Sequence, residues 1–425
     1  MHQITGIISV SFRFVKNRVH RLFYGILKLL KYSLSAPAAY DKMYSVCCGK
    51  QQDQQQRCDT VRKNIDISQL SPEELEAEKL RRRKKLRRKK VMTVVDRIFG
   101  FFLATGIVLG CAGLALGMII CRGPSEALKV MFVQTALETR RFDFVPQVFL
   151  PDSEVHAIYK SNKIEEADEM DASLIKLPAQ EDGDTETEAV DYGTPDEDGD
   201  GIVFKEIKGN GYAGYMLICL DPGRVFVGKP DSYGGVGLTL EEMCLKYDAV
   251  GGINAGGFLD DAGTGLGGFP DGLTVIEGVM YSEGHGGDCF AGLDVNNLLW
   301  VGFYGPENME AMQIRDGVSF GPILIQNGEI INEQNLLSGV NPRTAIGQRG
   351  DGAILMLVVD GRQAHSIGAT YLDMAEGMLD YGAVNAMNMD GGSSTVMWYE
   401  GQYVNSCSAA YGTSRPLPNA FLIRK

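Results

Sequence analysis

The sequence has little histidine and lacks several motifs of metal-dependent and nucleophilic hydrolases. Five of the 425 residues are histidine, and His285 and His365 are the two that fall between residues 201 and 425. A two-metal cluster of histidine and carboxylate ligands is therefore disfavoured. The nine cysteines include no C-x-x-C pair, which argues against a zinc site, and Ser393 does not stand in a G-x-S-x-G motif of the kind that holds a serine nucleophile. These residues require no cofactor, although a divalent cation is compatible with the many acids.

A run of 24 residues, Ile98 to Cys121, lacks any charged side chain. At about 1.5 Å per residue, a helix of this length crosses the roughly 30 Å hydrocarbon core of a bilayer. The run is too long and lies too deep in the chain to be a cleaved signal peptide. Ten of the twelve residues from Lys79 to Lys90 are basic. Their position beside the apolar run favours a cytoplasmic cluster over a nucleic-acid patch, so no nucleic-acid partner is expected.

Charge is divided unevenly along the chain. Residues 1–97 carry 22 Lys and Arg against 9 Asp and Glu, a net of +13; because the whole chain carries −13, residues 98–425 carry −26. We therefore expect a cytoplasmic basic segment (1–97), one transmembrane helix (98–121) and an acidic part outside the cell membrane. Residues 1–40 mix bulky apolar and basic side chains. This pattern is typical of a helix on an anionic leaflet, and a start codon assigned too far upstream explains it equally well.

Residues 122–200 predict a stalk followed by an acidic linker. Pro124 to Lys163 has helical spacing. Glu165 to Gly201 contains fifteen acids and one lysine, which is typical of a solvated, largely disordered spacer. Its end, residues 196–201, imitates a calcium-binding loop. An EF-hand would need Glu at position 207, where the chain has Ile207, so a linker is favoured.

Residues 201–425 predict an α+β domain with a mixed β-sheet. Glycine and Asp-Pro turns between short apolar runs favour antiparallel hairpins. One stretch instead predicts a β-α-β crossover: a strand at Ala353–Val359, a helix at Tyr371–Leu379 and a strand at Ala383–Met389. The two strands are then expected to be parallel neighbours that carry Asp360 and Asp390 to one sheet edge. The hairpin strands are expected at Ile202–Ile207, Tyr215–Leu220, Arg224–Val227, Leu273–Ile276, Leu298–Tyr304 and Ile323–Ile325.

Polar and glycine-rich stretches mark candidate site loops. After Asp390, Gly391 and Gly392 let the backbone approach a ligand, and the amides up to Ser394 suit an anion-binding nest. A tight turn without function is the alternative. Arg343 offers a planar fork that suits phosphate or carboxylate. The alternative is a buried structural pair between Arg343 and an aspartate.

Taken together, these stretches resemble the phosphodiester glycosidase family over roughly residues 201–425. One difference is that two glycines follow Asp390, where many members have three. The preceding membrane anchor resembles bacterial cell-surface members that are often labelled exopolysaccharide proteins. The motifs that carry the resemblance are Ile253-Asn254-Ala255-Gly256-Gly257-Phe258, Gly267-Gly268-Phe269-Pro270-Asp271-Gly272, Gly321-Pro322, Pro342-Arg343-Thr344-Ala345-Ile346-Gly347, Val359-Asp360-Gly361-Arg362 and Met389-Asp390-Gly391-Gly392-Ser393-Ser394.

The resemblance implies a site in which Asp390 and Asp360 are the catalytic acids, with acid and base roles not separated. Asp271 and Glu277 are held in reserve as the second acid. Ser393 is disfavoured as a nucleophile, because the neighbouring loop histidine, His365, has no evident orienting acid in sequence. The expected substrate-binding residues are Asn254, Gly256, Gly257, Arg343, Thr344, Arg362, Gly391, Gly392, Ser393 and Ser394.

The resemblance further implies a surface-anchored hydrolase of sugar-1-phosphodiesters that acts on envelope polysaccharide or glycan. Two alternatives remain open at this point. The domain is a non-catalytic glycan-binding or exopolysaccharide assembly module, or it is a phosphodiesterase that attacks phosphorus. The outer cysteines, Cys219, Cys244, Cys289 and Cys407, are in a part of the chain where disulfides can form, although Cys219 lies in an apolar strand and is expected in the core.

The predicted topology can be tested directly. Because the basic cluster precedes the apolar run, protease added to intact cells should digest residues 122–425 and spare residues 1–97. Immunoblotting of each end of the chain measures this. Protection of the carboxyl-terminal part until the cells are lysed would reverse the orientation.

Overall fold

The computed structural model describes residues 71–138, 142–161, 169–177, 192–259, 265–284, 289–331, 333, 336, 338–409 and 412–425. Residues 1–70, including the amphipathic helix expected at 1–40, lie outside this part of the chain, as does His285. The chain forms two compact units, one ending at Arg122 and the other beginning at Gly123.

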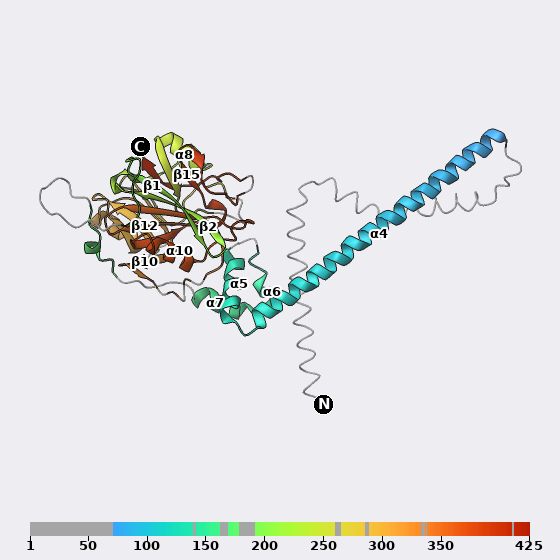
Figure 1. The fold of residues 1–425 in the computed structure, drawn as a ribbon, viewed down its shortest axis with the longest axis horizontal. Coiled ribbons are helices and arrows are strands. Elements are labelled where there is room, and N and C mark those ends of the chain that lie inside the picture. The colour runs from blue at the N-terminus through green and yellow to red at the C-terminus, as the bar shows by residue number, and fades with distance from the viewer. Residues whose placement is uncertain are drawn as a thin grey trace, which may run out of the picture. The chain divides into compact units, whose positions relative to one another are not determined.

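In the first unit, the described residues form one continuous helix, α4 (Pro72–Arg122) (Figure 1). Proline suits its first position because the first N–H groups of a helix have no intrahelical partner. The helix contains both the basic cluster and the apolar run. Its part from Ala104 to Arg122 is long and apolar enough to cross a membrane by length and composition, with a mean hydropathy of 2.2.

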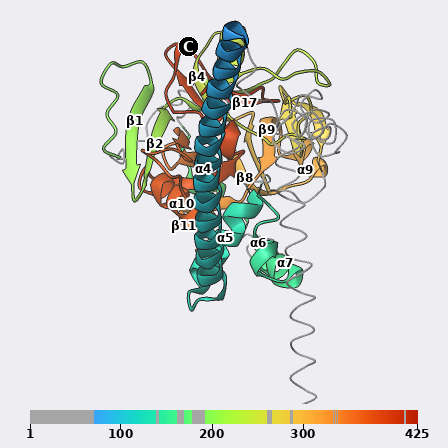
Figure 2. The same cartoon turned by 90° about the vertical axis from the view of Figure 1, so that its right-hand side faces the viewer.

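The second unit begins with three helices, as the sequence predicts for residues 124–163. They are α5 (Glu126–Glu138), α6 (Pro146–Phe149) and α7 (Asp152–Ser161). They pack on one another and form a small group on one side of the sheets (Figures 1 and 2). These helices belong to the same compact unit as the sheets.

Where it is described, the expected spacer packs on the domain and is not a free linker. Around a short 3₁₀ turn, η3 (Ala172–Leu174), the side chains of Met170 and Ile175 are buried against Leu298. Farther along, the Arg349 guanidinium lies 4.2 Å from the ring centroid of Tyr192. The many acids obscured these few apolar and aromatic contacts in the sequence.

A seven-stranded sheet is the centre of the unit, and each pair of neighbouring strands runs antiparallel. The β1–β2 hairpin forms one edge (Figure 2). The predicted α+β fold with antiparallel hairpins is confirmed. In spatial order the strands are β1 (Ile202–Gly209), β2 (Tyr212–Cys219), β13 (Ile354–Val359), β12 (Arg343–Arg349), β14 (Ala383–Met389), β10 (Ile323–Gln326) and β11 (Glu329–Ile330).

The crossover from β13 through α10 (Tyr371–Leu379) to β14 is present, and its two strands are parallel to each other. The prediction that they are neighbours is wrong, because β12 lies between them and pairs antiparallel with both. Arg343, expected in a loop just before a strand, is itself the first residue of β12. Helix α10 begins at a capping box, in which the Thr370 hydroxyl accepts from Asp373 N and the Asp373 carboxylate accepts from Thr370 N.

Two five-stranded sheets complete the unit, again with antiparallel neighbours. The first contains β16 (Gln402–Tyr403), β15 (Met397–Tyr399), β4 (Ala249–Asn254), β17 (Ala420–Arg424) and β3 (Val225–Gly228), with the turn η4 (Pro222–Arg224) and helix α8 (Leu240–Tyr247) beside it. The second contains β6 (Val279–Glu283), β5 (Leu273–Ile276), β9 (Ile314–Phe320), β7 (Cys289–Asp294) and β8 (Leu299–Phe303), with helix α9 (Pro306–Ala311).

The seven-stranded sheet is buried on both faces, which explains its continuous apolar runs. On β13, Met356 and Val358 face a core shared with the two smaller sheets. Leu355 and Leu357 face the opposite core, beneath α10. Cys219 on β2 is fully buried, as predicted, and burial raises the pKa of its thiol to about 12.

Asn254 connects three segments of the chain near Asp390 through its buried amide. Its Oδ1 accepts from the Thr344 hydroxyl at 2.8 Å and from Val396 N at 3.0 Å. Its Nδ2 donates to the carbonyl of Asp390 at 2.6 Å. One side chain with no exposure therefore ties the end of β4 to the start of β12 and to the loop after β14.

Removing this amide should destabilise the domain. Asn254→Ala leaves the Thr344 hydroxyl and the Val396 amide buried without partners, so the free energy of unfolding should fall by about 2–4 kcal/mol. Denaturant titration of the full chain measures this. The matched control is Asn296→Ala, because Asn296 is exposed and such changes stay within about 0.5 kcal/mol. Equal stability of the two variants would contradict the structural role.

Candidate functional site

The candidate site lies at the end of the seven-stranded sheet where β13 and β14 finish and β12 begins, here called the site edge. Arg343 is opposite Val359, and Thr344 is opposite Met389. Asp360 and Asp390 follow those partners, so they share one edge, as predicted. Since adjacent strands are about 4.8 Å apart, the two backbones, with β12 between them, are separated by about 10 Å.

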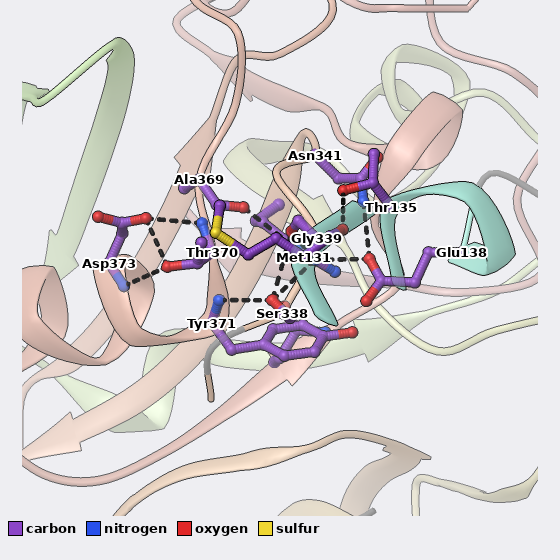
Figure 3. A network of polar contacts seen from close by, with 12 residues as sticks. Met131, Thr135, Glu138, Ser338, Gly339, Asn341, Ala369, Thr370, Tyr371 and Asp373 are labelled. Atoms are coloured by element: carbon purple, nitrogen blue, oxygen red, sulfur yellow. Dashed lines mark hydrogen bonds and ion pairs between the residues drawn. The ribbon is translucent and has the colours of Figure 1, made fainter. Parts of the chain in front are cut away.

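Arg343 is the most constrained side chain at this edge, with 4% exposure. Its Nη2 donates to Glu138 Oε2 at 2.7 Å, and its guanidinium lies 3.9 Å from the ring centroid of Tyr371. Figure 3 shows these two partners, Glu138 and Tyr371. The sequence alternative of a buried ion pair is correct in kind, but the acid is a glutamate from α5. The other acceptors come from nearby loops and are Ser338 Oγ at 3.2 Å, Gly339 O at 2.7 Å and Ala369 O at 3.3 Å.

A second arginine, Arg362, lies beside the first. Its Nη2 donates to Asn341 Oδ1 at 3.0 Å, and Asn341 Nδ2 donates to Glu138 Oε2 at 2.7 Å. One carboxylate oxygen of Glu138 thus receives hydrogen bonds from Arg343 and from Asn341, and Asn341 relays the contact to Arg362. We call the two arginines and Asn341 the anion subsite.

Charges within the anion subsite act strongly on one another. Desolvation opposes the charge of Arg343, but Tyr371 and then Glu138 outweigh it and raise the pKa of the guanidinium. Burial raises the pKa of Tyr371 to about 12. Arg362 reaches solvent, yet partial desolvation and then repulsion from Arg343 lower its pKa, while Glu138 acts in the opposite direction.

The glycines after Asp390 approach protein backbone. A Cβ on Gly391 would lie 2.9 Å from the carbonyl oxygen of Pro342, and Gly392 has a φ of 62°. Gly392 N donates to Pro342 O at 2.9 Å, and Ser394 N donates to Gly391 O within the turn η6 (Gly392–Ser394). Two of the four amides expected to bind an anion therefore already have partners in the protein.

Asp360 is almost completely buried, with 1% exposure, and both of its oxygens accept hydrogen bonds. Oδ1 accepts from Asn405 Nδ2 at 3.2 Å and Ser406 N at 2.9 Å, and Oδ2 lies 2.9 Å from His365 Nε2. The view that His365 lacks an orienting acid is therefore wrong, since the loop folds it back onto an acid five residues earlier. The His365 side chain is 48% exposed.

Several predicted binding residues lie behind the site edge. Asn254 and Thr344 are buried and bond to each other. Gly256 N donates to Asn419 Oδ1 at 2.8 Å, and a Cβ on Gly257 would lie 3.0 Å from the Phe320 ring. All four residues therefore contact other protein groups, and Asn254 also holds the backbone of Asp390 through its carbonyl.

Sequence reasoning missed three buried polar atoms near this backbone. Among the described residues, Asn388 Oδ1, Asn419 Nδ2 and Thr395 Oγ1 are buried without a hydrogen-bond partner. Buried orphans of this kind are rare and call for a ligand or water. Asn388 gave a signal in sequence, as an amide within the apolar strand two residues before Asp390.

The remaining candidate acids lie on other segments of the chain than the strand ends of the site edge. The reserve acid Glu277 is in the turn between β5 and β6, and Asp271 N donates to Gly257 O at 2.9 Å. In the predicted calcium-like loop, one carboxylate oxygen each from Asp196, Asp198 and Asp200 lie within 4.8 Å of one another. This exposed cluster is a chemically suitable cation ligand set, but its acids already cap backbone amides of their own loop, such as Gly199 and Gly201.

Comparison with known proteins adds the family. A sequence model of the phosphodiester glycosidase family matches residues 247–424. The SPbeta prophage-derived uncharacterized protein YomE of Bacillus subtilis (strain 168) is 30% identical over 182 residues, which is 40% of this chain and 27% of that protein. Human N-acetylglucosamine-1-phosphodiester alpha-N-acetylglucosaminidase is 28% identical over 215 residues, which is 44% of this chain and 40% of that protein. The chain thus spans less than half the length of these relatives.

Two solved structures are also similar to this chain. The catalytic domain of the zebrafish N-acetylglucosamine-1-phosphodiester alpha-N-acetylglucosaminidase, described as auto-inhibited by its pro-peptide, has 19% identity and a TM-score of 0.45; the match covers 53% of this chain and 82% of that one. A hypothetical protein from Synechocystis has 16% identity and a TM-score of 0.44; the match covers 53% of this chain and 62% of that one. Residues 247–424 match the family model, and the motifs of the site edge lie within them. The chain therefore contains a domain of the phosphodiester glycosidase family.

Proposed function

We propose that this protein is a membrane-anchored hydrolase that cleaves a sugar-1-phosphodiester between the anomeric carbon and its oxygen. Its domain lies outside the cell and acts on envelope glycan or polysaccharide. The family of residues 247–424 supports the reaction class. The observation that carries the proposal is the anion subsite beside Asp390, where the Arg343 guanidinium and the Asn341 amide both donate to one carboxylate oxygen and Asn341 also accepts from Arg362.

The anion subsite suits the phosphate of such a substrate. Arg343 and Arg362 offer charged N–H donors, and a guanidinium fork matches phosphate oxygens better than an ammonium group does. Neutralising the phosphate makes it a better leaving group, because negative charge develops on its oxygen as the glycosidic bond breaks. At Arg343 this effect is strengthened, because its guanidinium is only 4% exposed and the local screening by water is weak.

The proton transfers need two further groups. Asp390, at the end of β14, is partly exposed and acts at the anomeric carbon as base or nucleophile. Asp360 is too buried to touch substrate, so we assign it a positioning role. Its carboxylate fixes His365, whose exposed ring carries the second proton transfer.

The position of the broken bond tests the reaction. Hydrolysis of a chromogenic N-acetylglucosamine phosphodiester in oxygen-18 water should place the label in the sugar, because a glycosidase attacks the anomeric carbon. Mass spectrometry of both products measures it. Label in the phosphate would instead identify a phosphodiesterase, and binding without any product from a panel of sugar phosphodiesters would identify a non-catalytic glycan-binding module.

The roles of Asp390 and His365 can be distinguished by how their substitution changes kcat. Asp390→Asn keeps the shape and should lower kcat by a factor on the order of 10² or more. His365→Ala should give a comparable loss that added imidazole partly restores, because the 48% exposed position is open to solvent. Steady-state kinetics with and without imidazole measure both.

The matched control is His156→Ala, a change at an exposed histidine of α7 that should leave kcat unaltered. Loss of activity in His365→Ala that imidazole does not relieve would assign His365 a structural role. Normal turnover by Asp390→Asn would move the reacting carboxylate elsewhere.

A further inference from the structure

The carboxylate of Glu138 lies where the proposed function needs a phosphate. Glu138 is the last residue of α5, 205 residues before Arg343 in the chain. Its Oε2 accepts from Arg343 Nη2 at 2.7 Å and from Asn341 Nδ2 at 2.7 Å (Figure 3). These donors cannot direct the same hydrogens to a second anion at the same time. Occupation by Glu138 and occupation by a phosphate oxygen are therefore mutually exclusive.

Helix α5 is fitted to the loop that holds these donors. A Cβ on Gly339 would lie 2.5 Å from both N and Cα of Thr135, one turn before Glu138. Only glycine at position 339 allows the helix to come this close. Within the same helix, Val133 has no exposure, and the Thr135 hydroxyl donates to Met131 O at 2.7 Å, so the turn before Glu138 is intact.

The charge of Glu138 acts on the whole anion subsite. It supports the protonated form of Arg343, counteracts the lowering of the Arg362 pKa, and contributes to the raised pKa of Tyr371. The acid is itself 25% exposed, whereas Arg343 is 4% exposed. Glu138 is thus the partly accessible member of the pair and covers the buried cation.

We infer that Glu138 is an internal competitor that closes the anion subsite, and that substrate phosphate binds by displacing it. That the displacing anion is the substrate phosphate rests on the proposed function, because that function places phosphate at Arg343. The contrasting possibility is a permanent structural ion pair. In that case removing the acid would lower stability and leave anion affinity unchanged or weaker.

Anion binding tests this without turnover. Inorganic phosphate is titrated into the full chain in detergent micelles, by calorimetry, for wild type, Glu138→Gln and Glu138→Ala. Since competition lowers apparent affinity by the fraction of open sites, both variants should bind phosphate with a Kd at least about tenfold lower than wild type. The matched control is Glu126→Gln, because Glu126 lies on the same helix, is 74% exposed and pairs with Lys129.

The same change of charge at Glu126 should leave the Kd at the wild-type value. Equal phosphate affinity in Glu138→Gln and Glu126→Gln, or weaker affinity in Glu138→Gln, would overturn the inference. If the Glu138 variants fail to fold, wild type supplies the test. Saturating phosphate should then increase hydrogen exchange of the amides near Glu138 at the end of α5, and unchanged exchange despite phosphate binding would overturn it.

Turnover separates this inference from the proposed function. Tighter phosphate binding by Glu138→Gln, with no hydrolysis of sugar phosphodiesters by any variant, would support the competitor and reject the hydrolase. Hydrolysis by wild type, with identical KM and phosphate Kd in Glu138→Gln, would support the hydrolase and reject the competitor.

Discussion

The guanidinium of Arg343 is a cation with almost no contact with water, and the arrangement of the site edge follows from that constraint. An isolated charge in such a position would cost several kcal/mol, so it must be paired and fully hydrogen-bonded. The chain meets this requirement with acceptors from three places: the end of α5, the loop before β12 and the residues before α10. Segments distant in sequence are thereby brought together around one side chain.

The site edge also separates support from chemistry. Asn254 and Asp360 are buried and have their polar atoms occupied, so they fix backbone and side chains instead of meeting a ligand. Asp390 and His365 are each held by one hydrogen bond to this buried pair: the Asp390 carbonyl accepts from Asn254, and the His365 ring contacts the Asp360 carboxylate. A rigid inner layer that carries a partly exposed outer layer is the arrangement that positional precision in catalysis requires.

The sequence predicted elements whose signals are local, and it failed where partners are distant. The ranges of β13, α10 and β14 agree with the predictions within a residue, because apolar runs and helical spacing are local features. The neighbour relation failed because no local signal places β12 between two strands. The bond from His365 to Asp360 depends on how one loop folds back, and the pairing of Glu138 with Arg343 spans 205 residues. The shared edge of Asp360 and Asp390 was predicted because strand direction determines it.

The physical unit is larger than the segment that matches the family. The match begins at residue 247, and the sequence pattern suggested a domain from residue 201, yet Glu138 lies before both. A chain cut at either point would keep Arg343 buried at the start of β12 without its carboxylate partner. Breaking a buried pair by removing one partner costs about 3–5 kcal/mol unless another anion enters. Residues 126–138 therefore determine the electrostatics of the site as directly as the loops of the family motifs do.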